Sequence, residues 1–213
     1  MPPATRSETP VTVDLHGRVA LVTGASRGIG AAIAAALHDR GARVAALARD
    51  KDALDAAVAQ IGPGDSALAV PADVTDTESV RKAVAAAYDW GGRLDIVVNC
   101  AGPQLTPAPL ADTADTDLIR YLDVKLIGFH RVSSAALPLI SDTGTGRIIN
   151  VAGQTARTLV PNAGVTGITN AAVIALTSYL ASEGAARHVL VNAISPGMTL
   201  TEGWISRHEA MAA

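Results

Sequence analysis

Short apolar segments alternate along this chain with longer stretches whose apolar residues recur at helical spacing. Gly, Pro, Asn or Asp follow most of the apolar segments, which is typical of buried strands. The predicted strands are residues 19–22, 43–48, 67–70, 96–98, 147–151 and 189–194. Helices are predicted from residue 28, over 51–61, from 75 to about 90, from 112 to 140, and over 164–184. This alternation predicts an α/β fold, a doubly wound parallel sheet with strand order 3-2-1-4-5-6, whose ligand lies at the carboxyl ends of the strands.

The ends of the elements add detail. Thr75 is the expected N-cap of the third helix, with Glu78 at the matching capping-box position. Prolines and polar residues predict a flexible arm over residues 1–13. Residues 14–213 show no internal repeat, linker or second domain and predict one domain.

Composition narrows the class of protein. Hydrophobic residues make up 49% of the 213 residues and aromatics only 3%, so the core is built from Ala, Val, Leu and Ile. The net charge of −3 and the lack of a basic block argue against nucleic acid as a partner. Polar residues interrupt the apolar stretch 163–181, which therefore predicts a buried helix and not a membrane span. With a single cysteine, Cys100, and no apolar signal segment, we expect a cytoplasmic protein.

A glycine-rich turn joins the first strand to the first helix. Its glycines, Gly24, Gly28 and Gly30, are spaced Gly-x-x-x-Gly-x-Gly. Such a turn lets the backbone approach a pyrophosphate, and the helix N-terminus supplies N–H groups and a partial positive charge. The alternative is a glycine-rich turn that binds no ligand. The strand before it and the helix after it favour the dinucleotide site over this alternative. The sequence therefore predicts a dinucleotide site, and it predicts no metal site.

Several motifs in the same order resemble the short-chain dehydrogenase/reductase family over nearly the whole chain. Residues 23–30 match the cofactor loop, 73–74 the adenine contact, 99–102 the Asn-Asn-Ala-Gly segment with Cys100 in place of the second Asn, and 196–197 the turn beside the nicotinamide. The resemblance implies a Rossmann-like fold and a nicotinamide cofactor. The cofactor-binding residues that it implies are Gly24, Ser26, Arg27, Gly28, Ile29, Gly30, Arg49, Asp73, Val74, Asn99, Ala101, Gly102, Pro196 and Gly197.

Charge at the end of the second strand indicates which cofactor is preferred. A carboxylate there would bind the ribose hydroxyls of NAD(H) and repel a 2′-phosphate. This chain has Arg49 instead, and Arg27 lies in the glycine loop. Either arginine alone could be a solvated surface charge. Together, at the positions where the family binds the 2′-phosphate, they predict NADP(H) over NAD(H).

The family's catalytic residues are all replaced. Alignment on residues 146–150 and 171–173 places Gly153 at the serine position, Thr166 at the tyrosine, Asn170 at the lysine and Lys125 at the asparagine. A shifted alignment does not recover them, because residues 151–175 contain no Tyr. The sequence therefore predicts that the standard carbonyl-reductase mechanism is lost or replaced.

One literal Tyr-x-x-x-Lys remains, formed by Tyr121 and Lys125 on the helix of residues 112–140. Such a pair is most often an ordinary i,i+4 contact on a helix surface. The sharper hypothesis is a displaced catalytic pair, because Lys125 occupies the family's asparagine position and this end of the helix points toward the ligand.

The resemblance leaves the activity open. After Pro196-Gly197 the family continues to a seventh strand, which we expect to be absent here. The first hypothesis is an NADP(H)-binding protein with a non-standard reaction, such as a cyclisation or a reduction with another proton source. The second is a non-catalytic partner subunit, paired with itself or with an active relative. The third, a decayed fragment without cofactor, is disfavoured by the intact glycine loop. In either of the first two, the resemblance implies a homodimer through the helices near 112–140 and 164–184.

Overall fold

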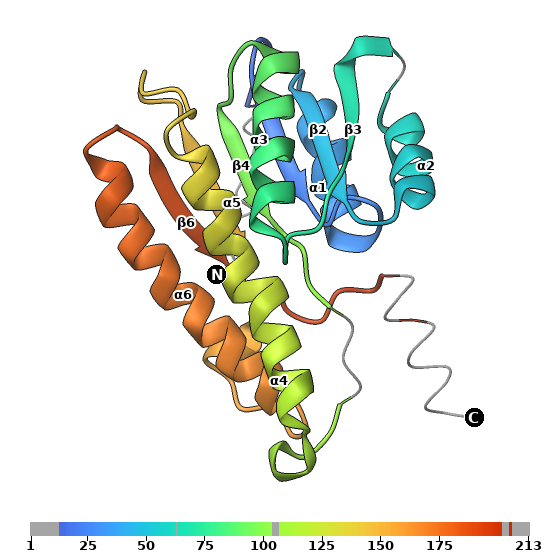
Figure 1. The fold of residues 1–213 in the computed structure, drawn as a ribbon, viewed down its shortest axis with the longest axis vertical. Helices are drawn as coiled ribbons and strands as arrows, with labels where there is room; N and C mark the ends of the chain where they lie inside the picture. The colour runs from blue at the N-terminus through green and yellow to red at the C-terminus, as the bar shows by residue number, and fades with distance from the viewer. Residues whose placement is uncertain (1–12, 63, 104–106, 202–204, 206–213) are drawn as a thin grey trace, which may run out of the picture.

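A computed structural model describes residues 13–62, 64–103, 107–201 and 205, and in it the chain forms a six-stranded parallel sheet between two layers of helices (Figure 1). The strand order is β3-β2-β1-β4-β5-β6, as the sequence predicts. The predicted flexible arm, residues 1–13, lies outside the described residues except for Val13. The strands are β1 (Val19–Thr23), β2 (Arg43–Ala48), β3 (Ala67–Pro71), β4 (Ile96–Asn99), β5 (Arg147–Val151) and β6 (Leu190–Ile194).

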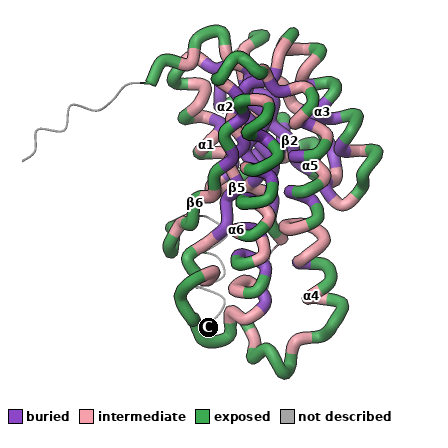
Figure 2. Tube along the Cα trace, turned by 90° about the vertical axis from the view of Figure 1, so that its left-hand side faces the viewer, coloured by how far each residue is buried: buried purple, intermediate pink, exposed green. Residues whose placement is uncertain are grey.

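The helices pack on the two faces of this sheet. They are α1 (Gly28–His38), α2 (Lys51–Ile61), α3 (Thr77–Gly91), α4 (Asp115–Leu122), α5 (Gly128–Ala136) and α6 (Gly164–Ala185). Successive side chains of a strand point to opposite faces. Ala20 and Val22 of β1 therefore pack with α1 and α2, whereas Leu21 packs with α3, α5 and α6. Figure 2 shows the buried residues concentrated in the strands.

Two details of the helices differ from the sequence prediction. The N-cap of α3 is Asp76 and not Thr75, because the Asp76 carboxylate accepts hydrogen bonds from the backbone N–H groups of Glu78 and Ser79 at 2.8 and 2.9 Å. Thr75 instead donates through its hydroxyl to Asp73. The helix predicted over 112–140 is divided into α4 and α5 by a π-helical turn, Asp123–Ile127.

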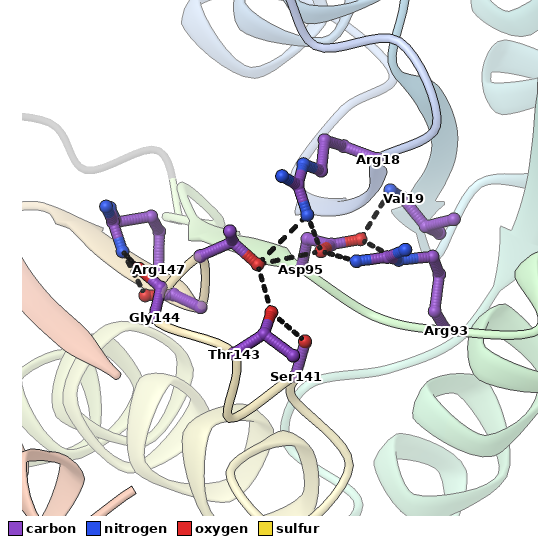
Figure 3. A network of polar contacts seen from close by, with 10 residues as sticks. Arg18, Val19, Arg93, Asp95, Ser141, Thr143, Gly144 and Arg147 are labelled. Atoms are coloured by element: carbon purple, nitrogen blue, oxygen red, sulfur yellow. Dashed lines mark hydrogen bonds and ion pairs between the residues drawn. The ribbon is translucent and has the colours of Figure 1, made fainter. Parts of the chain in front are cut away.

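Asp95 lies at the amino-terminal ends of the strands, on the opposite side of the sheet from their carboxyl ends. Its side chain is fully buried and accepts hydrogen bonds from Arg93, Arg18 and the backbone N–H of Val19 (Figure 3). Burial alone would raise the pKa of this carboxyl, but the hydrogen bonds from Arg93 and Val19 outweigh it and lower the pKa below its usual range. This ion cluster joins the starts of β1 and β4 to the loop before β5.

The helix α6 is long and apolar enough to cross a membrane by length and composition. In this fold it packs beside α4 and α5 and against β6 (Figure 1). Its inner face carries Thr177, whose hydroxyl accepts a hydrogen bond from the buried Asn150 of β5 at 2.9 Å. The helix is therefore part of the layer of helices that covers one face of the sheet.

Candidate functional site

A cleft of about 1000 Å³ lies at the carboxyl ends of the strands. Its wall begins with the glycine turn between β1 and α1, where Gly24 has a φ of +68°. A Cβ at Gly24 would come within 2.8 Å of Ala101 Cα, and one at Gly30 within 2.2 Å of the Gly24 carbonyl oxygen. Only glycine fits at these two positions, so the turn, the start of α1 and the loop after β4 lie in direct contact.

The N-terminus of α1 faces this cleft. Its first residues, Gly28, Ile29 and Gly30, all line the wall, and no side chain caps the helix at Arg27. Uncapped first-turn N–H groups and the helix dipole suit a phosphate. The glycine cradle and this uncapped helix end fit the pyrophosphate of a dinucleotide.

Arg27 and Arg49, the predicted pair for a 2′-phosphate, are both exposed and both line the cleft. The Arg49 guanidinium lies 4.0 Å from the Asp73 carboxylate, a loose and solvent-exposed ion pair. Asp50, the next residue after Arg49, also lines the cleft, but its carboxylate caps α2 by accepting a hydrogen bond from the Ala53 N–H. The positive charge at the end of β2 therefore stays available to an anionic ligand.

The predicted cofactor residues gather in the cleft with one exception. The exception is Asn99, which is fully buried beneath it and donates hydrogen bonds to Ser133 at 3.0 Å and Asn150 at 2.8 Å. Asn99 thus ties β4 to α5 and β5 and is not part of the cleft wall. The residues brought together in the wall are Gly24, Ser26, Arg27, Gly28, Ile29, Gly30, Arg49, Asp73, Val74, Ala101, Gly102, Pro196 and Gly197.

The positions of the family's serine, tyrosine and lysine lie together at the other half of the cleft. Gly153 follows β5, and Thr166 and Asn170 are one turn apart on α6; all three line the wall. Asn170 donates a hydrogen bond to the Thr155 hydroxyl at 2.8 Å. None of the three carries an ionisable group that could act as an acid near neutral pH. The residues at these positions therefore form a neutral part of the cleft wall.

Tyr121 and Lys125 both line the same half of the cleft. Tyr121 is buried in α4, and Lys125 lies in the π-helical turn that follows. The Lys125 ammonium donates a hydrogen bond to the Ala152 carbonyl oxygen at 3.0 Å, directly beside Gly153. Burial lowers the pKa of Lys125 to about 8, and burial raises the pKa of the neighbouring Cys100 thiol to about 11. Tyr121 and Lys125 are therefore part of the cleft and not a pair on the outer surface.

Several residues that line the cleft were not predicted from the sequence. They follow β5 or β6 or precede α6, where loops at the carboxyl ends of strands line a ligand site, and no motif marks them. Among the residues that the structure describes, no three His, Cys, Asp or Glu side chains gather to hold a metal ion. The lining residues that the sequence did not single out include Gln154, Thr155, Asn162, Ala163, Met198, Thr199 and Thr201.

Comparison with known proteins agrees with this geometry. Residues 18–212 match the family model described as short chain dehydrogenase. An uncharacterized oxidoreductase of Methylorubrum extorquens is 39% identical over 191 residues, covering 89% of this chain and 76% of that protein. A short chain dehydrogenase from Burkholderia cenocepacia in complex with NADP is 36% identical with a TM-score of 0.82, covering 89% of this chain and 78% of that one. The 3-ketoacyl-(acyl-carrier-protein) reductase from Brucella melitensis, complexed with NADH, is 32% identical with a TM-score of 0.84, covering 89% and 79%.

Proposed function

The chain belongs to the short-chain dehydrogenase family, and on that premise we propose that it is a divergent oxidoreductase-type protein that binds NADP(H). Bound NADP(H) would supply or accept a hydride. The proposal includes a second part, that the family's usual proton-transfer residues are replaced and the reaction is a non-standard one. We further propose a cytoplasmic setting, in keeping with the single cysteine, which can form no disulfide within the chain.

The observation that carries the cofactor proposal is the coincidence of two features in one cleft. The glycine cradle and the uncapped N-terminus of α1 suit a pyrophosphate. Arg27 and Arg49 line the same cleft and suit a further phosphate, since guanidinium groups pair with phosphate oxygens. Relatives are known with either dinucleotide, one solved with NADP and one with NADH. The two arginines are our reason for preferring NADP(H).

The proposal of a non-standard reaction rests on the residues at the family's catalytic positions. Positioned acid–base catalysis is worth roughly 10²–10⁴-fold in rate. Gly153, Thr166 and Asn170 provide no acid of suitable pKa, because a threonine hydroxyl is far weaker than a phenol tuned by a lysine. The rate of ordinary reduction of neutral ketones is therefore expected to be close to the uncatalysed background. A cofactor-assisted reaction without net redox, such as a cyclisation, is compatible with the same cleft.

A non-catalytic partner subunit is the second candidate, favoured by the outer face of α6. Small and apolar side chains line that face, and Tyr179 is 74% exposed on it. Such a face suits the helix of a second subunit, either another copy of this chain or an active relative. The helices near 112–140 and 164–184 would form this contact.

Isothermal titration calorimetry with NADPH and NADH on the purified protein tests the proposal. We expect NADPH to bind at least about tenfold more tightly, because only NADPH offers the 2′-phosphate to two arginines. Equal affinities would contradict the NADP(H) preference, and no binding of either would overturn the cofactor proposal. Consumption of bound NADPH with any substrate would then identify a redox enzyme and contradict a non-catalytic partner subunit.

A further inference from the structure

Lys125 is the only charged residue among the described lining residues in the half of the cleft formed by the ends of β5 and β6 and the start of α6. The other charged lining residues, Arg27, Arg49, Asp50 and Asp73, come from the glycine turn and from the ends of β2 and β3. The other polar side chains that line this half of the cleft are neutral, including the amides of Gln154 and Asn170 and the hydroxyl of Thr166. An ammonium therefore stands alone where a substrate would lie beside the cofactor site.

The ammonium is also poorly neutralised by the protein. An ammonium has three N–H donors, and within the described residues only one has a partner, the Ala152 carbonyl oxygen at 3.0 Å. No described carboxylate lies within ion-pair distance of it. Besides the charged residues named above, two titratable groups line the cleft with it, the Tyr121 phenol and the Cys100 thiol that follows β4. The thiol stays neutral near pH 7 because burial raises its pKa to about 11. A part-buried charge without a counter-ion costs free energy, and an anionic ligand would remove that cost.

We propose that this half of the cleft binds a small molecule with an anionic group, a carboxylate in the first instance, and that Lys125 is its counter-ion. This proposal rests on the proposed function, since it names the class of molecule placed beside the cofactor. Gly153, next to the Ala152 carbonyl that accepts from the ammonium, carries no side chain, and the neutral Asn170 amide occupies the space that a side chain there would need. An anionic ligand in this half of the cleft would account both for the replacement of the family's catalytic residues and for the part-buried lysine.

The π-helical turn gives this arrangement a structural origin. A π turn inserts one extra residue into the helix and is frequent at functional sites. Here it spans Asp123–Ile127, with Lys125 at its centre. Asp123 in the same turn is engaged elsewhere, because its carboxylate accepts a hydrogen bond from Arg131 at 2.7 Å. The turn thus presents the lysine to the cleft while its own carboxylate is held by another cation.

The test compares a carboxylic acid with its neutral ester, 4-oxopentanoate and methyl 4-oxopentanoate, by calorimetry with and without saturating NADP⁺. We expect the acid to bind roughly 10–100-fold more tightly than the ester, the effect of a charge-assisted hydrogen bond. Lys125→Met should remove this difference by weakening the acid alone. Lys82→Met is the matched control, because Lys82 is exposed on α3, does not line the cleft and pairs with Glu78. Equal affinity for acid and ester, or no binding of the acid at millimolar concentration, would overturn the proposal.

A second readout does not depend on activity. Burial lowers the pKa of Lys125 to about 8, and a bound carboxylate should raise it, so binding at pH 8 takes up as much as about half a proton. Calorimetry in buffers of different ionisation enthalpy measures this uptake. Since the ammonium form binds, the affinity for the acid should fall by up to about tenfold per unit above pH 8. No proton uptake in the wild type would count against the proposal. The NADP⁺ titration of the same samples reports separately on the cofactor proposal.

Discussion

The side chain of Asn170 occupies the space that a side chain at position 153 would need. A Cβ built on Gly153 would lie 2.6 Å from the Asn170 Nδ2 atom, which donates a hydrogen bond to the Thr155 hydroxyl. The φ of Gly153 is 172°, an extended conformation that any residue adopts. The neighbouring side chain, and not the backbone, therefore keeps this position a glycine. The positions of the family's serine and lysine are coupled in this protein.

This coupling predicts that Gly153→Ser alone is destabilising. Asn170 would have to rotate and lose its bond to Thr155, which costs on the order of 1–3 kcal/mol. Urea unfolding measures the loss. Gly102→Ser is the control, because a Cβ at Gly102 meets no atom within 4 Å. A loss no larger at position 153 than at position 102 would contradict the coupling.

The catalytic consequence is a separate prediction. The wild type should reduce neutral ketones such as cyclohexanone with NADPH no faster than the uncatalysed background. The triple variant Gly153→Ser, Thr166→Tyr, Asn170→Lys should restore measurable turnover, because the phenol and its lysine act as a unit, and each single change should restore little. The oxidation of NADPH, followed by its absorbance, measures this. Ordinary rates in the wild type would contradict the loss of the standard mechanism, and Lys125→Ala and Tyr121→Phe would then test the displaced pair.

Charge reversal at Arg49 tests the basis of cofactor choice. Arg49→Asp should weaken NADPH roughly 10–100-fold and NADH by less than about threefold, because only NADPH brings a phosphate to that site. Calorimetry of both dinucleotides measures the two changes. Arg81→Asp on the exposed face of α3 is the control for net charge. An equal loss for both dinucleotides would indicate a general effect on the cleft.

The sequence was sufficient to predict the sheet because strand burial follows directly from local pattern. The predicted limits of β2 and β5 agree with the structure, and so does the strand order. The capping of α3 was wrong by one residue, since Thr75 and Asp76 are both good N-caps and only the three-dimensional turn around Asp73 decides between them. The π turn has no sequence signature of its own. Asn99 was assigned to the cofactor because its motif lies at the strand end, whereas its side chain points into the core.

The outer face of α6 predicts the assembly. Its exposed positions include Ile168, Ala175 and Tyr179, a stripe of small and apolar residues on one side of the helix. We expect a homodimer through α6 and the α4–α5 helices, since covering this stripe removes apolar surface from water. Analytical ultracentrifugation at micromolar concentration should give a dimer, and Ala175→Glu should give a monomer. Glu183→Lys, further along the same helix, is the control, because it changes a charge without adding bulk at a small residue of the stripe. A wild-type monomer at that concentration would contradict the prediction.

Asp95 predicts a stability effect far from the cleft. Asp95→Asn keeps the shape of the side chain but removes the charge that Arg18 and Arg93 neutralise (Figure 3), which should cost about 3 kcal/mol. For a chain of this size that loss corresponds to a fall of about 6–12 °C in Tm. Calorimetric melting at pH 7 measures it. Asp117→Asn, which breaks an exposed pair with Arg120, should cost less than about 1 kcal/mol.

The pH dependence of the same variant identifies the charge as the cause. The pKa of Asp95 is lowered in the folded protein, so its contribution is fully present above the unfolded value near about 4 and is lost as the pH falls through the folded pKa. The difference in unfolding free energy between wild type and Asp95→Asn should therefore be constant from pH 5 to 7 and shrink below about pH 4. Urea unfolding at a series of pH values follows this difference. A difference that stays constant down to the lowest pH at which both proteins fold would mean that packing or hydrogen-bond geometry, and not the carboxylate charge, holds this edge of the sheet.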